Sequence, residues 1–219
     1  MNKRKTRSEV QVLESYRIAL TNVELQPEIA STMAEFGYTT EVIAEGKTLL
    51  SETQNAWNFN KQEDNETREA YAIFSEKDSA LDGSYNLHRK KAKVVFRNDN
   101  VMLQKLALSG RTPKAYASKV ATMKTFYSEI IADADIQAKL ARLKFPKEEA
   151  DAGMTAIMEL EASRTAYLRE TGESQEATQA KDAAFDKLDK WMQEFYAVAK
   201  IAMDDKPQLL EALGILVRN

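Results

Sequence analysis

The side chains best suited to chemistry in this sequence are a single histidine, His88, and several groups of carboxylates. A di-iron carboxylate site in a helical bundle needs Glu-x-x-His pairs on facing helices. No acidic residue stands three positions before His88, so this kind of site is excluded. We interpret His88 as a structural or surface histidine, because a histidine without partner ligands is seldom a ligand or a catalyst.

Two groups of carboxylates fall near one face of a predicted helix. They are Glu41, Glu45 and Glu52 in the first half and Glu148, Asp151 and Glu159 in the second. Such groups could bind a hard cation. However, acidic residues are also expected in the first turn of a helix and on its solvated face. The sequence therefore assigns no metal site and no cofactor.

The usual enzyme motifs are missing from the sequence. There is no cysteine to act as a nucleophile, and seven scattered glycines form no phosphate-binding loop. No Gly-x-Ser-x-Gly elbow occurs, and a Ser-His-Asp triad would have to use His88. We expect a protein that is not an enzyme.

Basic residues cluster in two places. One is the N-terminal tail, residues 2–7, and the other lies within a predicted long helix, at Arg89, Lys90, Lys91, Lys93 and Arg97. These five side chains could contact a polyanion. Yet the net charge is −3, so there is little overall attraction to phosphates. A solvated helix face is the favoured interpretation, and polyanion binding is the alternative.

The elements that would position these side chains are all expected to be helices. Glycine and proline number only seven and four, whereas alanine, leucine, glutamate and lysine are abundant. No stretch approaches 18 apolar residues, and the basic N-terminus has no apolar segment behind it. We therefore expect no transmembrane segment, no secretory signal and a cytoplasmic location.

The sequence also contains an internal duplication. Shifting the chain by 107 residues places residues 27–111 over 134–218 without a gap, and 17 of these 85 positions are identical. Many other pairs keep apolar character and approximate size, such as Met33/Leu140 and Phe96/Met203. The predicted repeats are 5–109 and 112–216.

Hydrophobic periodicity divides each repeat into five helices. The predicted ranges are 8–24, 27–36, 40–63, 66–97 and 100–108, then 113–131, 134–143, 147–170, 173–203 and 206–213. Gly37 is expected to end a helix in a left-handed conformation, and Thr112 to cap the helix that begins at Pro113. Residues 64–67 and 171–174 are expected to form tight reversals around Asn65 and Gly172.

Helices of this kind predict an all-α fold, an antiparallel helical bundle built from two tandem repeats. Each repeat would contribute two long helices and shorter flanking helices. Because a single hairpin leaves an apolar face exposed, we expect residues 1–219 to form one integrated domain with pseudo-twofold symmetry. The alternative is two three-helix lobes in tandem.

The second repeat resembles a functionally uncharacterised family of bacterial all-helical proteins of about this length. The residues that carry the resemblance are the closing run at 207–218, PQLLEALGILVR, together with the segments 172–178 and 187–191. The resemblance implies a bacterial all-helical protein. It provides no active-site residues to transfer.

Three functions follow from these observations. The leading hypothesis is a non-enzymatic protein-interaction or scaffold protein, whose partner is itself or another protein. The first alternative is a nucleic-acid or polyanion binder that uses Arg89, Lys90, Lys91, Lys93 and Arg97. The second alternative is a carrier of a small ligand or metal in the bundle core.

Overall fold

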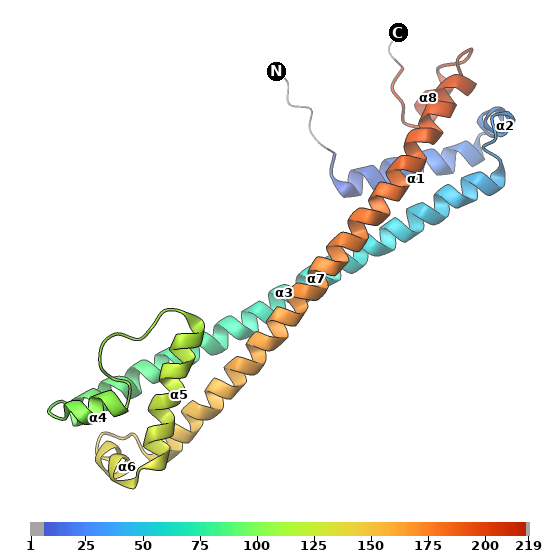
Figure 1. Cartoon of the computed structure of the whole chain (residues 1–219). Coiled ribbons are helices and arrows are strands. Elements are labelled where there is room, and N and C mark those ends of the chain that lie inside the picture. Colours follow the sequence, from blue (N-terminus) through green and yellow to red (C-terminus); the bar gives the residue numbers. More distant parts are fainter. Residues whose placement is uncertain (1–6, 218–219) are drawn as a thin grey trace, which may run out of the picture. The chain divides into compact units, whose positions relative to one another are not determined.

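The computed structural model describes residues 7–217, and every regular element in that range is an α-helix (Figure 1). The predicted all-α class is confirmed. The helices are α1 (Glu9–Leu25), α2 (Pro27–Glu35), α3 (Thr40–Val95), α4 (Asn100–Lys105), α5 (Tyr116–Ala132), α6 (Ala134–Ala141), α7 (Lys147–Ala202) and α8 (Leu209–Ala212). No helix within the described range is long and apolar enough to cross a membrane.

The chain forms two compact units. Unit 1 consists of Met1–Asp64 and Glu173–Asn219, and unit 2 consists of Asn65–Gly172. In unit 1, α1, α2 and α8 gather around the start of α3 and the end of α7 (Figure 1). In unit 2, α4, α5 and α6 gather around the end of α3 and the start of α7. Each unit therefore takes half of each long helix.

The core of unit 1 joins α1, α2 and the two long helices. Its buried side chains include Leu20, Ile29, Met33, Leu188 and Phe195. The long helices are also joined by polar contacts: Thr53 Oγ1 donates to the Ala184 carbonyl at 3.2 Å, and Asn60 Nδ2 to Thr178 Oγ1 at 3.0 Å. At α1, Ser8 and Gln11 form a reciprocal capping box that satisfies backbone N–H groups at the helix start.

The core of unit 2 is built in the same manner from α3, α5, α6 and α7. Its largest buried side chains include Tyr85, Phe126, Tyr127 and Phe145. At the start of this unit, Thr67 Oγ1 donates to the Glu170 carbonyl at 3.1 Å.

The two predicted reversals are wrong. Residues 64–67 lie inside α3 and residues 171–174 lie inside α7, so each repeat has one long helix in place of two. A single Asn or Gly costs a helix about 1 kcal/mol or less, and neither segment contains proline, so nothing forces a break. Nearby polar side chains also find helical partners, since Thr171 Oγ1 donates back to the Tyr167 carbonyl at 2.8 Å.

Helix ends were predicted with mixed success. Gly37 does adopt a left-handed backbone, with φ of 88°, and it ends α2. The helix expected to begin at Pro113 begins instead at Tyr116, with Ala115 as a cap residue that makes no side-chain cap bond. Thr112 therefore does not cap α5, and the prediction for this helix start is wrong.

Candidate binding surface at the end of α3

The basic residues predicted to contact a polyanion do not form one free face. The guanidinium of Arg89 donates to the carbonyl of Leu108 at 3.3 Å and also to that of Gly110. Lys91 Nζ donates to the carbonyl of Lys144 at 2.6 Å. These two cations hold the segments that follow α4 and α6 against α3, so their first role is structural.

The other three members of this stretch differ in exposure. Lys90 and Arg97 are exposed, whereas Lys93 is partly buried. Burial lowers the pKa of Lys93, and the nearby positive charge of Arg89 adds to this effect. Of the five predicted residues, Arg97 is the one that lines a hollow in the surface.

This hollow has a volume of about 700 Å³ and lies entirely within unit 2. Arg97 joins Lys139 of α6 and Arg142, the residue that ends α6, on its rim. Val94 and Leu143 supply apolar walls, and their side chains are 60% and 38% exposed. We name these five residues the α3-end patch.

The patch is held in place by buried neighbours. Phe96 follows α3 directly and is only 3% exposed, and the Lys139 ammonium lies 5.8 Å from the centre of its ring. Asp99 turns the chain into α4, because its carboxylate accepts from the backbone N–H of Met102 at 2.9 Å. The apolar and cationic groups of the patch are thus carried by packed elements.

Sequence reasoning found Arg97 and missed Lys139, Arg142 and Leu143. The signal was present in the run Lys139-Leu140-Ala141-Arg142-Leu143-Lys144, which carries three cations within six residues. What the sequence could not show is that α6 packs beside the end of α3. That placement depends on buried contacts from residues far apart in the chain.

His88 is buried in unit 2 and does not form part of the patch. Its ring stacks on Phe145, with centroids 4.1 Å apart and planes at 11°. Nε2 lies 2.7 Å from Glu149 Oε2, and Nδ1 lies 3.0 Å from the Tyr127 hydroxyl. Because an ionised carboxylate can only accept, Nε2 carries the proton and Nδ1 accepts from Tyr127 in the neutral ring.

Burial sets the charge of this histidine. Burial lowers the pKa of His88, and this effect outweighs the opposing attraction of Glu149. Lys91 lowers the pKa further through its positive charge. The pKa of Tyr127 is raised, mainly by burial, so its hydroxyl stays a donor. The structural interpretation of His88 fits these surroundings.

The predicted carboxylate groups lie on exposed or partly exposed faces, and several are paired with nearby side chains. Glu41 accepts from Thr39, Asp151 pairs with Lys147, and Glu159 pairs with Lys77. No two of these six residues occur together in a group with metal-ligand spacing among the described residues.

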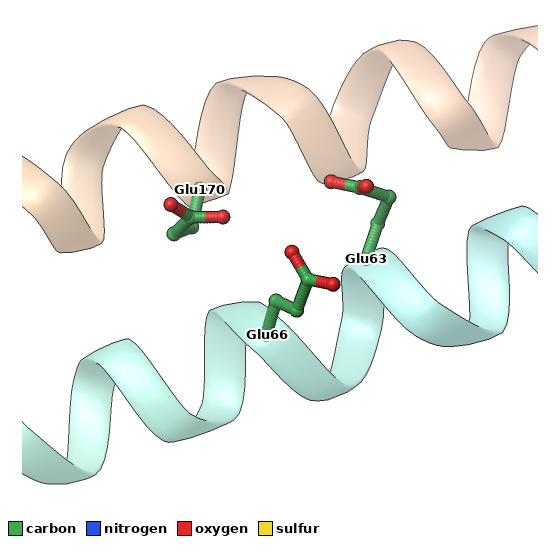
Figure 2. Close-up of side chains that lie close together, drawn as sticks. All are labelled: Glu63, Glu66 and Glu170. Carbon is green, nitrogen blue, oxygen red and sulfur yellow. The ribbon is translucent and has the colours of Figure 1, made fainter.

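A different set of carboxylates draws together two members from unit 2. Figure 2 shows Glu63 and Glu66 on α3 and Glu170 on α7. Within unit 2, one oxygen of Glu66 and one of Glu170 lie within 4.8 Å of each other. The Glu170 carboxylate also pairs with the Arg169 guanidinium at 2.5 Å. Because this ion pair balances the Glu170 charge, we treat the acidic pair as part of the helix packing.

Unit 1 has a smaller hollow between α1 and α3. Its volume is about 330 Å³, and Leu13, Leu50 and Trp57 contribute its apolar walls. The Trp57 indole N–H donates to Glu9 at 3.1 Å, which fixes the ring at one side of the hollow. This is the place that a small apolar ligand would occupy if the chain carried one.

Comparison with known proteins gives no relative for the chain. No family model, no curated protein and no solved structure matches it. The arguments about function therefore depend on the chain's own geometry.

Proposed function

We propose that this chain is a non-enzymatic protein-interaction protein and that the α3-end patch is its docking surface. The observation that carries the proposal is the combination of exposed Val94 and Leu143 with three cations around one hollow. Apolar side chains gathered in a surface hollow with a polar rim are typical of protein-binding surfaces. Arginine is also favoured at such surfaces, because its planar guanidinium pairs well with carboxylates.

The chemistry of the patch indicates what its partner must offer. Apolar walls gain little from a nucleic-acid backbone, but they gain from burial against apolar side chains. The cationic rim favours carboxylates over cations in the same partner. The partner is therefore an exposed protein surface in which one or two apolar side chains are flanked by Asp or Glu.

We further propose that the chain is a tandem duplication whose repeats pair in an antiparallel manner. The helix bounds support it, because α3 and α7 are both 56 residues long and begin 107 residues apart. Left-handed positions support it too: Gly37 corresponds to Lys144, and Ala107 corresponds to Gly214. Few backbones place a non-glycine residue in this region, so the agreement is informative.

The two cores support the duplication as well. Corresponding positions are buried in unit 2 and in unit 1, as in Leu81/Leu188, Ala92/Ala199, Phe96/Met203, Leu106/Leu213 and Ile136/Ile29. Contacts between the long helices support the antiparallel pairing. In unit 1, Thr53 contacts Ala184 while the later residue Asn60 contacts the earlier residue Thr178.

A direct test of the docking function uses a labelled helical peptide with a leucine face flanked by glutamates. Wild-type protein is expected to bind it, and the double variant Arg97→Glu/Arg142→Glu is expected to lose most of that binding. Fluorescence anisotropy measures both affinities. A matched control is Lys90→Glu/Lys187→Glu, which changes the net charge equally at exposed positions outside the patch. Equal binding by the two double variants would remove the basis for the proposal.

The polyanion alternative makes a different prediction. It would use Lys90 and Lys93 together with Arg97, and its affinity would fall steeply with salt. A labelled oligonucleotide should then lose affinity on Lys90→Glu as well as on Arg97→Glu. The carrier alternative would place an apolar ligand in the hollow beside Leu13, Leu50 and Trp57, where binding should change Trp57 fluorescence.

A further inference from the structure

The α3-end patch of unit 2 has a counterpart in unit 1 with the opposite charge. Counting 107 residues along the chain, Val94 corresponds to Ile201 and Leu143 corresponds to Phe36, so both apolar positions stay apolar. Ile201 and Phe36 are 64% and 48% exposed. The charged positions reverse: Arg97 corresponds to Asp204, and Arg142 corresponds to Glu35.

The counterpart residues belong to one region of unit 1. Lys206, just after α7, forms an ion pair with Glu28 of α2. Tyr38, just after α2, packs against Phe195 of α7, with ring centroids 5.5 Å apart. These contacts bring the end of α2 beside the end of α7. We name Glu35, Phe36, Ile201, Asp204 and Asp205 the α7-end patch, and all five side chains are exposed.

We propose that the partner of the α3-end patch is a second copy of this chain, which presents its α7-end patch. This inference rests on the proposed docking function. Three cations on one patch face three carboxylates on the other, and each patch has two exposed apolar side chains to bury. The same sequence therefore carries both halves of a complementary pair, at positions that correspond in the two repeats.

The geometry of this pairing has a consequence for assembly. The two patches differ, so a contact between them leaves one patch of each kind unused on the resulting pair. Contacts of this heterologous type continue into an open chain or close into a ring. We therefore expect assembly that grows with protein concentration and weakens with salt, since exposed charge pairs are screened within about 8 Å at physiological ionic strength.

Charge reversal on the full-length chain tests the pairing. Variant A carries Arg97→Glu/Arg142→Glu and has two acidic patches, whereas variant B carries Glu35→Arg/Asp204→Arg and has two basic patches. Sedimentation velocity over a concentration series at low salt is expected to show assembly of the wild type. Each variant alone should self-associate about tenfold or more weakly, because like charges then face each other.

Mixing separates pairing from damage. An equimolar mixture of variants A and B restores one acidic and one basic patch to each contact, so hetero-assembly should return. The control Lys90→Glu/Lys187→Glu should assemble as the wild type does. Failure of the mixture to assemble, or equal loss of assembly in the control, would overturn the pairing. So would a wild type that stays monomeric at every concentration.

The same samples distinguish this inference from the docking function itself. If the wild type stays monomeric but binds the glutamate-flanked helical peptide through Arg97 and Arg142, the second copy is the wrong partner and the docking surface stands. If both assembly and peptide binding are absent, both proposals fall. Circular dichroism of each variant shows whether its helices are intact.

Discussion

At the scale of single residues, His88 shows how a polar group is fitted into a helical core. The neutral ring satisfies both nitrogens, one through Tyr127 and one through Glu149, while its face covers Phe145. A charged ring would lose the bond from the Tyr127 hydroxyl to Nδ1 and would have to be desolvated. Protonation of His88 therefore opposes folding of unit 2.

The pH dependence of stability follows from this. The pKa of His88 in the folded chain lies below its ordinary value of 6.5, so the unfolded chain binds the proton more readily. The stability contributed by neutral His88 is present above pH 6.5 and is lost as the pH falls below it. Melting temperatures between pH 7 and pH 5 should drop more steeply for the wild type than for His88→Phe. Parallel curves would show that His88 does not titrate in this way.

Lys144 is a second residue whose conformation is costly. It adopts φ of 53°, where its counterpart Gly37 adopts 88°. An L-residue in this region is destabilised by about 1 kcal/mol, and glycine avoids that cost. Lys144→Gly should therefore raise the free energy of unfolding by up to about 1 kcal/mol in urea titrations. Lys144→Ala is the matched control: it removes the same exposed side chain, keeps the strain, and should gain nothing.

At the scale of the elements, helix existence could be predicted from sequence, and helix continuity could not. The ranges of α1, α2 and α6 follow from apolar periodicity within a residue or two. The interiors of α3 and α7 were misjudged because Asn65 and Gly172 are typical of chain reversals. Local propensity of this size is overcome by tertiary packing, and sequence alone does not report which long-range contacts are available.

Side-chain partners across the helices were equally hard to predict. In unit 1, Glu9 accepts from the Trp57 indole at 3.1 Å and from Lys181 at 2.7 Å. The corresponding positions in unit 2 form a different cluster, in which the Arg164 guanidinium lies 3.9 Å from the Tyr116 ring centre. The repeats keep the backbone and the core, but each unit reaches its own polar solution. A repeat signal cannot reveal such differences.

Gly172→Ala tests the continuity of α7. A Cβ built at Gly172 meets no atom within 4 Å, so alanine is accommodated without a clash. In a continuous helix, alanine should raise the free energy of unfolding by up to about 1 kcal/mol. A left-handed reversal at this position would give a loss of similar size. The comparison variant is Gly153→Ala, also in α7, where the added Cβ would overlap the Tyr127 ring and should destabilise the chain.

At the scale of the whole molecule, the repeat and the compact unit are different divisions of the same chain. A repeat such as 5–109 contains one long helix with parts of both units. Unit 2, by contrast, is one continuous segment, Asn65–Gly172, and it contains a complete buried core from Leu81 to Leu160. The prediction of a single integrated domain over residues 1–219 concerns how the two units cooperate, which excision of each segment addresses.

The excised segments should therefore behave unequally. A fragment of residues 65–172 retains every buried residue of its core, so it should fold as a monomer and unfold cooperatively in thermal circular dichroism. A fragment of residues 5–109 keeps α1 to α4 but loses every α5, α6 and α7 side chain that these helices pack against. As a monomer it should lack a cooperative transition, because its exposed apolar faces have no partner. A cooperative monomeric fold for 5–109 would mean that the repeat, and not the unit, is the smallest part that buries its own core.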